Sequence, residues 1–400
     1  MLETFAVLPV ILIAAFSFNE LFKRIGLPPV VGQILAGIIL GIPMIKTMIF
    51  GPENLLIVDF LSVLGIVFLL LLVGLEIDLK KIMESSKDSI LISFGSALVP
   101  LVLGFIFLRA MGYDVVASIV FGGALMVTAE GTTVKVLMDL NTLNTRLGAI
   151  TVAAGAIDDI FEVLFLSMVT ILAHGGTFTG LAVLPIELLA FVAVSFVSFK
   201  IISKVLGYIE RKGDNVELFS VVLIFVLIMA ILSDALQIGY LIGAIIAGFL
   251  LQVSMKSLRK KDEEEIVETT KLLTLAFVVP FFFINIGLNF DFSTLLGNSI
   301  LLIATVVIAF SGKILGTLVT KPFSSLSTKQ LYLVGWGMNS RGAVELVIAL
   351  LARNYGLIPP EVFSALVAMA IITTLAFPFV LTREIEKNPG IMDATSAKCI

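Results

Sequence analysis

Runs of apolar residues, each long enough to cross a lipid bilayer, follow one another along almost the whole chain with short polar segments between them. A spanning helix needs about 20 mostly apolar residues, because the hydrocarbon core of a bilayer is about 30 Å thick. The pattern predicts thirteen membrane-spanning helices. Their approximate bounds are 4–21, 29–47, 58–77, 88–110, 113–138, 146–173, 178–208, 216–233, 237–254, 271–288, 294–319, 329–353 and 361–382.

The composition of the 400-residue chain fits this pattern, since 59% of the residues are hydrophobic, 14% are charged and the mean hydropathy is +1.13. Soluble domains are about 45–50% apolar and about a quarter charged. Cys399 and His174 are the single cysteine and the single histidine, so the sequence offers no disulfide framework and no Cys/His metal site. We expect no cofactor and no nucleic-acid partner. The first apolar run lacks a basic start and a cleavage site, and we interpret it as a retained helix.

Lysine and arginine residues indicate which loops face the cytoplasm, because cytoplasmic loops carry an excess of both. Of the 26 lysines and arginines, nearly all fall on odd-numbered loops, on the helix ends that face them, or in the C-terminal tail. Lys46, Arg109 and Arg353 fall on the opposite side, and two more lie within helices. We therefore expect a multi-pass protein of the cell (inner or plasma) membrane, with its N-terminus outside and its C-terminus in the cytoplasm.

The two halves of the chain resemble each other at an offset of about 211 residues. The segment 32–37 resembles 243–248, and Glu130-Gly131 aligns with Arg341-Gly342. Equivalent helices lie an odd number of spans apart, so the two copies are inverted in the membrane. Inverted repeats with interrupted helices at equivalent positions are typical of secondary transporters. The alternative is a chance likeness between helices rich in Gly, Ala and Leu.

The repeat defines the expected organisation: an all-α polytopic membrane protein in which two inverted repeats contribute crossed broken helices. We expect one transmembrane domain over residues 1–383, followed by a short cytoplasmic tail, 384–400. Its parts are a first repeat at 1–173, a linker helix at 178–208 and a second repeat at 215–383.

Several ionisable residues lie inside the predicted spans, where each is a functional hypothesis by default because charge is costly at that depth. At a rise of 1.5 Å per residue, they lie about 12–18 Å from the cytoplasmic ends of four different helices. The group consists of Thr128 and Glu130 in one helix, Asp158, Asp159 and Glu162 in the next, and Lys313 and Arg341 in two later helices. Agreement in depth favours a single site.

These residue types suit a site where a proton and a hard cation compete. A desolvated carboxylate resists ionisation until a cation stabilises it, and hard cations prefer oxygen ligands. Thr128, Thr132 and Thr133 surround Gly131, and a helix break there would free carbonyl oxygens as well. Asp158 and Asp159 leave their helix about 100° apart, so one can face an ion while the other faces Lys313.

Other interpretations of the same residues remain open. Asp158 and Asp159 would cap a helix if a loop were misplaced, and Lys313 would extend to the cytoplasmic surface. Glu130 and Arg341 would form a structural salt bridge between the two breaks, and Glu162 would serve either the site or its support. The charged run 256–265 is most simply a solvated loop.

An ordered series of motifs resembles the monovalent cation:proton antiporter-2 family, specifically its sodium/proton antiporters with an Asp-Asp motif. The resemblance covers nearly the whole chain. The matching segments are Leu64–Glu76, Gly131–Leu137, Asn144–Gly148 leading to Ala156–Asp159, Val279–Gly287, Gly312-Lys313, Gly337-Met338 with Arg341-Gly342, and Thr373-Thr374.

The resemblance implies the sodium/proton antiporter fold and a homodimer in which a core bundle moves like an elevator. The core bundle would consist of the fourth to sixth and eleventh to thirteenth helices. The resemblance further implies that Asp159 carries the ion and the proton, that Asp158 pairs with Lys313 when sodium is absent, and that Thr128 lies at the crossover. Sodium would then bind at Asp159, Asp158 and Thr128.

Three residues depart from the family pattern. Relatives usually have Arg-Gly-Glu-Val-Gly where this chain has Arg341-Gly-Ala-Val-Glu345, so that one carboxylate is displaced by two positions. Glu130 replaces a usually apolar residue, and Glu162 replaces a usual glycine. These acids bear on ion preference and on the number of protons exchanged. Glu162, Glu345, Thr132 and Thr133 are therefore expected as supporting residues, and Lys313, Arg341 and Glu130 as charge-compensating residues.

Taken together, the residues and the resemblance predict a secondary antiporter, not an enzyme, that exchanges sodium or lithium for protons with net movement of charge. The alternatives are potassium/proton exchange, electroneutral exchange of another monovalent cation, and a membrane sensor or scaffold without transport. A channel would need a filter of carbonyls or rings of charge, and an enzyme would need a nucleophile with its base. The sequence shows neither.

Overall fold

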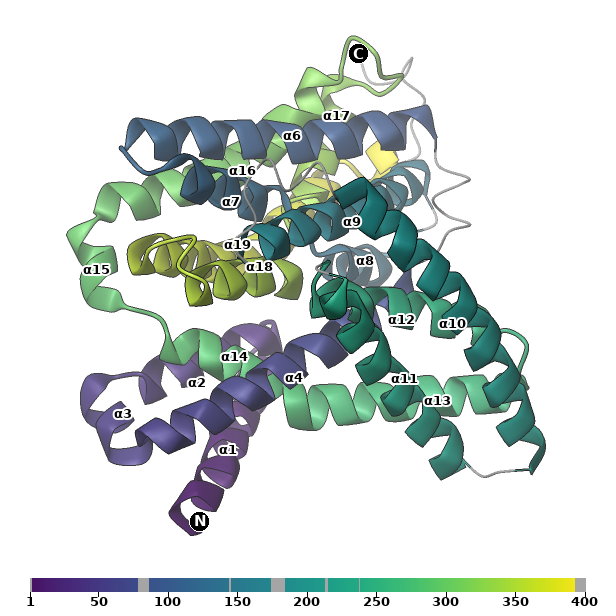
Figure 1. The fold of residues 1–400 in the computed structure, drawn as a ribbon. Coiled ribbons are helices and arrows are strands. Elements are labelled where there is room, and N and C mark those ends of the chain that lie inside the picture. Colours follow the sequence, from purple (N-terminus) through teal and green to yellow (C-terminus); the bar gives the residue numbers. More distant parts are fainter. Residues whose placement is uncertain are drawn as a thin grey trace. The chain divides into compact units, whose positions relative to one another are not determined.

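The computed structural model describes residues 2–77, 86–143, 145–173, 184–212, 215–236 and 238–392. Every regular element in these ranges is a helix (Figure 1). The chain divides into a first unit, Met1–Ile77 with Leu166–Asn289, and a second unit, Asp78–Phe165 with Phe290–Ile400. The long helix α9 (Arg146–Ala173) contributes residues to both.

The first unit is held together by close contacts between glycines on neighbouring helices. Its elements are α1 (Leu2–Arg24), α2 (Pro29–Leu40), α3 (Pro43–Ile49), α4 (Pro52–Glu76), α10 (Leu184–Lys212), α11 (Asn215–Ala235), α12 (Tyr240–Met255), α13 (Lys260–Leu273), the π-helical turn η2 (Thr274–Val278) and α14 (Val279–Leu288). Gly37 of α2 lies against Gly287 of α14, and Gly74 of α4 lies against Gly248 of α12. Small residues let helix backbones approach closely within a membrane.

These contacts reflect the internal repeat. Gly37 and Gly248 are equivalent positions at the offset of about 211 residues, and Gly74 is equivalent to Gly287 because the segment 73–78 resembles 286–291. Gly37 therefore packs on Gly287, which is the equivalent of Gly74. Gly74 in turn packs on Gly248, which is the equivalent of Gly37. Reciprocal contacts of this kind are expected between two copies related by a two-fold axis.

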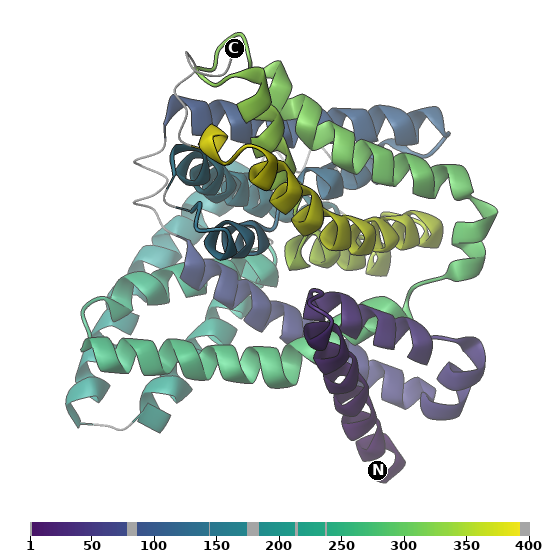
Figure 2. The same cartoon turned by 180° about the vertical axis from the view of Figure 1, so that it is seen from behind.

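The second unit contains the helices expected to form the core bundle. Its elements are α6 (Lys87–Ala110), α7 (Val115–Met126), α8 (Glu130–Asp139), most of α9, α15 (Phe292–Gly297), α16 (Ser299–Val319), α17 (Thr328–Gly337), α18 (Ala343–Asn354), α19 (Pro360–Lys387) and the short turn η3 (Pro389–Met392). Helix α16 packs against α6, α17 and α19, and Figure 2 shows α16 and α19 from behind.

Eight helices in the described ranges are long and apolar enough to cross a membrane, and the bent pair α2–α3 makes a ninth. They match nine of the expected spans. The other four expected spans correspond to α12, which has 16 residues, to α9, which carries three acids, and to two helices that are broken in the middle. The all-helical membrane fold is confirmed, whereas the count of thirteen spans stays a prediction.

Two expected segments differ from the structure in detail. The span expected at 29–47 bends by 84° between α2 and α3, because Pro43 starts the second helix and the residue before a proline avoids the helical conformation. Ile42 accordingly has ψ 128°. The charged run at 256–265 is not all loop, since α13 begins at Lys260. Its Glu and Lys side chains include an i,i+4 pair, Lys260–Glu264, of the kind that supports a solvated helix.

Candidate ion site

Two broken helices of the second unit supply the backbone of the site. Helix α7 ends at Met126 and α8 begins at Glu130, and Val127 between them is extended with φ −62° and ψ 143°. Helix α17 ends at Gly337 and α18 begins at Ala343. Both breaks were predicted, but the first lies before Gly131 and not around it. Thr128 therefore stands in the break itself, and Thr132 and Thr133 belong to the first turn of α8.

The two breaks touch each other. The Ala129 N–H donates to the Ser340 carbonyl at 3.0 Å, and the Ser340 hydroxyl donates to the Ala129 carbonyl at 2.7 Å. A Cβ placed on Gly342 would lie 2.5 Å from the Ala129 Cβ, so the approach requires glycine there. Ala129 and Ser340 are equivalent positions of the two halves, at the same offset of about 211 residues that the sequence shows.

Two buried cations cap the C-terminal end of α7. Lys313 of α16 donates to the Met126 carbonyl, and the Arg341 guanidinium donates to the carbonyls of Leu125 at 2.8 Å and Val127 at 2.6 Å. The last carbonyls of a helix lack intrahelical partners and carry the negative end of its dipole. Positive charge at this position therefore stabilises the broken helix inside the membrane.

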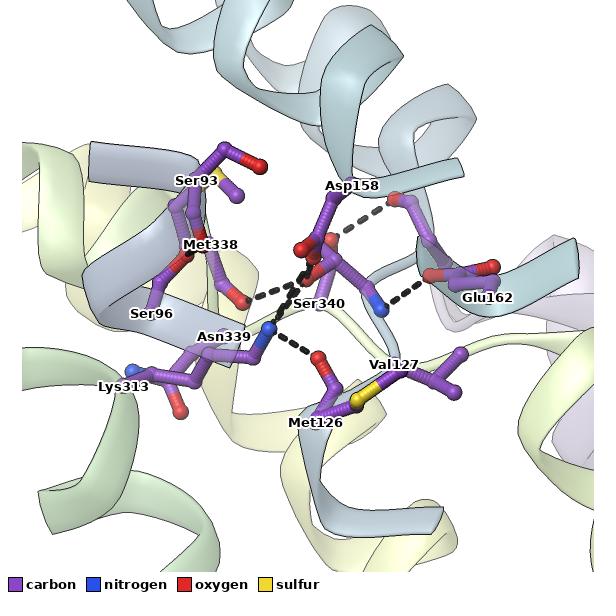
Figure 3. Close-up of polar contacts among 12 residues, drawn as sticks. Ser93, Ser96, Met126, Val127, Asp158, Glu162, Lys313, Met338, Asn339 and Ser340 are labelled. Carbon is purple, nitrogen blue, oxygen red and sulfur yellow. Dashed lines mark hydrogen bonds and ion pairs between the residues drawn. The ribbon is translucent and has the colours of Figure 1, made fainter. Parts of the chain in front are cut away.

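Asp158 lies at the centre of the site, on the middle of α9 (Figure 3). Its Oδ2 accepts from the Thr128 hydroxyl at 2.5 Å and from the Lys313 ammonium at 3.1 Å. Lys313 also donates to the Thr128 Oγ1 at 2.5 Å. Lys313 is 0% exposed and Asp158 1%, so Lys313 does not reach the cytoplasmic surface and Asp158 does not cap a helix end. Both of those alternative interpretations are wrong.

Glu162 reaches the same break from one turn further along α9. Its Oε1 accepts from the Thr128 N–H at 2.6 Å, next to the start of α8, where negative charge is favourable. Asp159 follows Asp158 in α9, is half-buried, and interacts electrostatically with Glu162. Two carboxyl groups, those of Asp158 and Glu162, thus meet the Lys313 ammonium group and the Thr128 hydroxyl at a single stretch of open backbone.

The remaining expected residues lie nearby with other partners. Arg341 Nε is 4.0 Å from Glu345 Oε2, and both side chains are 0% exposed. Neither Glu345 oxygen accepts a hydrogen bond within the part of the chain that the structure describes. The side chain of Glu130 lies outside the described residues, so its pairing with Arg341 stays a prediction. Thr132 is half-buried, and Thr133 donates to the Gly337 carbonyl at 2.7 Å.

Sequence reasoning missed two contributors, Ser340 and the Met126 carbonyl. Ser340 is neutral, whereas the sequence argument selected ionisable residues within the predicted spans. Its equivalence to Ala129 in the repeat was a usable signal, because residues on a two-fold axis contact each other. The Met126 carbonyl becomes available only because α7 ends there, and the sequence does not fix that residue.

Comparison with known proteins connects this geometry to a family. The family model described as sodium/hydrogen exchanger, transmembrane, matches residues 10–385. The Na+/H+ antiporter of Enterococcus hirae is 28% identical over 394 residues, covering 97% of this chain and 100% of the relative. The Na+/H+-K+ antiporter GerN of Bacillus cereus is 27% identical over 377 residues, covering 94% of this chain and 95% of the relative.

A solved structure has the same fold. The sodium proton antiporter MjNhaP1 from Methanocaldococcus jannaschii, determined at pH 8, superimposes with a TM-score of 0.72 at 17% sequence identity. The match covers 98% of both chains. At this identity the likeness concerns the fold alone.

Proposed function

The chain belongs to the transmembrane sodium/hydrogen exchanger family of cation/proton antiporters, and from this premise we propose that it exchanges sodium for protons across the cell membrane. The observation that carries the proposal is the sharing of one carboxylate oxygen, Asp158 Oδ2, between the Lys313 ammonium and the Thr128 hydroxyl. A cation that enters this site competes with an internal cation, the lysine, for the same oxygens.

The exchange follows from this competition. Asp159, next to the occupied Asp158, is the carboxylate that holds either a proton or sodium. Sodium at Asp159 draws Asp158 and the Thr128 oxygen as further ligands, since it prefers oxygen, and weakens their hold on Lys313. Protonation of Asp159 removes its charge and releases the ion. Proton and sodium thus exclude each other at Asp159. The gradient of either ion can therefore drive the other ion across the membrane in the opposite direction.

Alternating access requires a body that carries the site, and the second unit is the natural candidate. Asp158, Asp159, Thr128 and Lys313 all belong to it. We propose an elevator-type movement in which the second unit changes the side to which the site opens. The proposed assembly is a homodimer in the lipid bilayer, with the N-terminus outside and the C-terminus in the cytoplasm.

Potassium is the second candidate cation. The printed name of one relative, the Bacillus cereus protein, includes potassium, and the extra acids Glu130, Glu162 and Glu345 set this site apart from the family pattern. Lithium, which is smaller than sodium, remains a further candidate substrate.

Flux measurements test the proposal. The chain is reconstituted in vesicles with a pH-sensitive dye, and Na+, Li+ or K+ is added in separate runs. We expect sodium to drive proton flux and Asp159→Asn to abolish it, while Asp139→Asn, which changes an exposed carboxylate on α8, leaves flux intact. Robust sodium-driven proton flux in Asp159→Asn would refute the role of Asp159. Potassium-driven flux without sodium-driven flux would select the second candidate.

A further inference from the structure

Ser340 is fully buried at the contact between the two breaks and carries no charge. Its hydroxyl lies 2.7 Å from the Ala129 carbonyl and 2.8 Å from the Thr133 hydroxyl. Its carbonyl accepts the Ala129 N–H at 3.0 Å. Ser340 therefore holds the peptide groups on both sides of Ala129, the residue that follows Thr128.

The sequence explains why this role falls to one residue and not to its equivalent. Ala129 and Ser340 occupy equivalent positions of the two similar halves. Two residues on a two-fold axis are expected to exchange reciprocal bonds. Here the backbone of Ala129 supplies one bond and the side chain of Ser340 supplies the return bond. Ala129 has no hydroxyl, so only Ser340 can serve this position.

The backbone is consequently held both before and after the Thr128 side chain. Its N–H is bound by Glu162 at 2.6 Å, and the Ala129 peptide groups that follow it are bound by Ser340. Between these two attachments, the Thr128 Oγ1 is placed 2.5 Å from both Asp158 Oδ2 and Lys313 Nζ. Non-helical backbone within a membrane needs such replacement partners.

We infer that Ser340 is a positioning residue that sets the affinity of the cation site by holding Thr128 through the Ala129 peptide. The inference rests on the proposed function, because Thr128 is taken as a cation ligand. It assigns a role in substrate affinity to the second break, which supplies none of the proposed cation ligands. It also separates Ser340 from Asp159, which carries the ion and the proton.

The first experiment measures the sodium KM and the maximal flux of Ser340→Ala, Ser340→Thr and the control Thr305→Ala. Thr305 is also fully buried in the second unit, but its hydroxyl donates within its own helix, to the Leu301 carbonyl at 2.5 Å. We expect Ser340→Ala to raise KM about tenfold, since an unsatisfied buried carbonyl loosens the break. Maximal flux should stay within about twofold, Ser340→Thr should restore KM, and Thr305→Ala should leave it unchanged.

The second experiment asks whether Ser340 acts through Thr128. Thr128→Val removes the hydroxyl ligand, and Ser340→Ala is added to it. If Ser340 only positions Thr128, the double variant should have the KM of Thr128→Val alone, because effects on one shared group do not add. Independent, additive increases in KM would overturn the inference.

A third measurement separates this inference from the proposed function. The thermal unfolding temperature of purified protein is followed against sodium concentration, which reports binding without transport. A half-saturating concentration that rises in Ser340→Ala supports the positioning role even if flux is weak. An unchanged half-saturating concentration, or a loss of maximal flux with unchanged KM, would contradict it. A wild-type chain that neither binds nor exchanges sodium contradicts the proposed function and, with it, this inference.

Discussion

At the scale of single residues, the site consists of buried charges that depend on one another. Lys313 and Asp158 are both almost completely excluded from solvent, and removing charge from water is costly unless a partner and hydrogen bonds compensate. The Lys313 ammonium donates to three oxygens, those of Met126, Thr128 and Asp158. One Asp158 oxygen, Oδ1, has no hydrogen-bond partner among the described residues and is available to an incoming cation.

Replacing one member of the Asp158–Lys313 pair should destabilise the protein more than replacing both. We expect Asp158→Asn and Lys313→Gln each to lower the free energy of unfolding by about 3–5 kcal/mol, since each leaves an uncompensated buried charge. The double variant should recover part of that loss. Thermal unfolding of the four proteins in detergent measures the cycle. Purely additive losses would show that the 3.1 Å contact contributes no coupling.

At the scale of elements, the broken helices are stabilised by groups of the appropriate sign. Lys313 and Arg341 bind three successive carbonyls at the end of α7, and Glu162 binds an N–H just before α8. Protein groups thus satisfy the open ends of these half-helices, as non-helical backbone within a membrane requires. Lys313 serves both α7 and Asp158, so the same cap links the stability of the break to the proposed cation site.

The close approach of the two breaks makes a prediction about Gly342. A methyl group there would meet the Ala129 Cβ at 2.5 Å, and overpacking typically costs about 1–3 kcal/mol. Gly342→Ala should therefore lower the unfolding temperature. Gly207→Ala on α10 is the control, because nothing lies within 4 Å of a Cβ at that position. Ala129→Gly combined with Gly342→Ala should regain stability, and a double variant no better than the single one would argue against the contact.

The charge pair predicted between the breaks, Glu130 with Arg341, makes a second element-scale prediction. Arg341 already binds two carbonyls of α7 and stands 4.0 Å from Glu345. We expect Glu130→Gln and Arg341→Gln each to destabilise the protein and the double variant to recover part of the loss. The same cycle with Glu345→Gln is the comparison. Coupling of Arg341 to Glu345 alone, measured by thermal unfolding, would assign the pair to Glu345 instead.

At the scale of the whole molecule, the candidate site lies in one of the two units. The described site residues, Thr128, Asp158, Asp159, Glu162, Lys313 and Arg341, all lie in the second unit, and the glycine contacts between α2, α4, α12 and α14 build the first. A site contained in one unit can move with that unit as a single piece. This arrangement is what the proposed elevator movement requires.

Net charge movement is the prediction that concerns the whole transport cycle. If sodium releases Lys313 from Asp158 and the site gives up two protons for one sodium ion, one charge crosses in each cycle. A membrane potential then contributes about 2.3 kcal/mol per 100 mV. Sodium addition on a solid-supported membrane should therefore give a current, which Asp159→Asn should lose. Exchange that is indifferent to voltage and gives no current would indicate one-for-one exchange, with the extra acids holding Lys313 or Arg341 in fixed pairs.

The sequence by itself determined the features that depend on composition and on single positions along the chain. Apolar runs predicted the membrane helices, because a bilayer demands about 20 such residues. The offset of about 211 residues predicted two related breaks, and buried charge identified Asp158, Asp159, Lys313 and Arg341 as a group. Each of these signals is local, or a comparison of the chain with itself.

Only the tertiary structure decided which atoms meet. The sequence did not show that the first break precedes Gly131, that Lys313 and Arg341 share the carbonyls of α7, or that Ser340 binds the peptide after Thr128. These contacts join residues from α7, α9, α16 and the second break, which lie far apart along the chain. Their partners are largely backbone carbonyls and N–H groups, which every residue carries, so side-chain identity cannot reveal them until the fold brings them together.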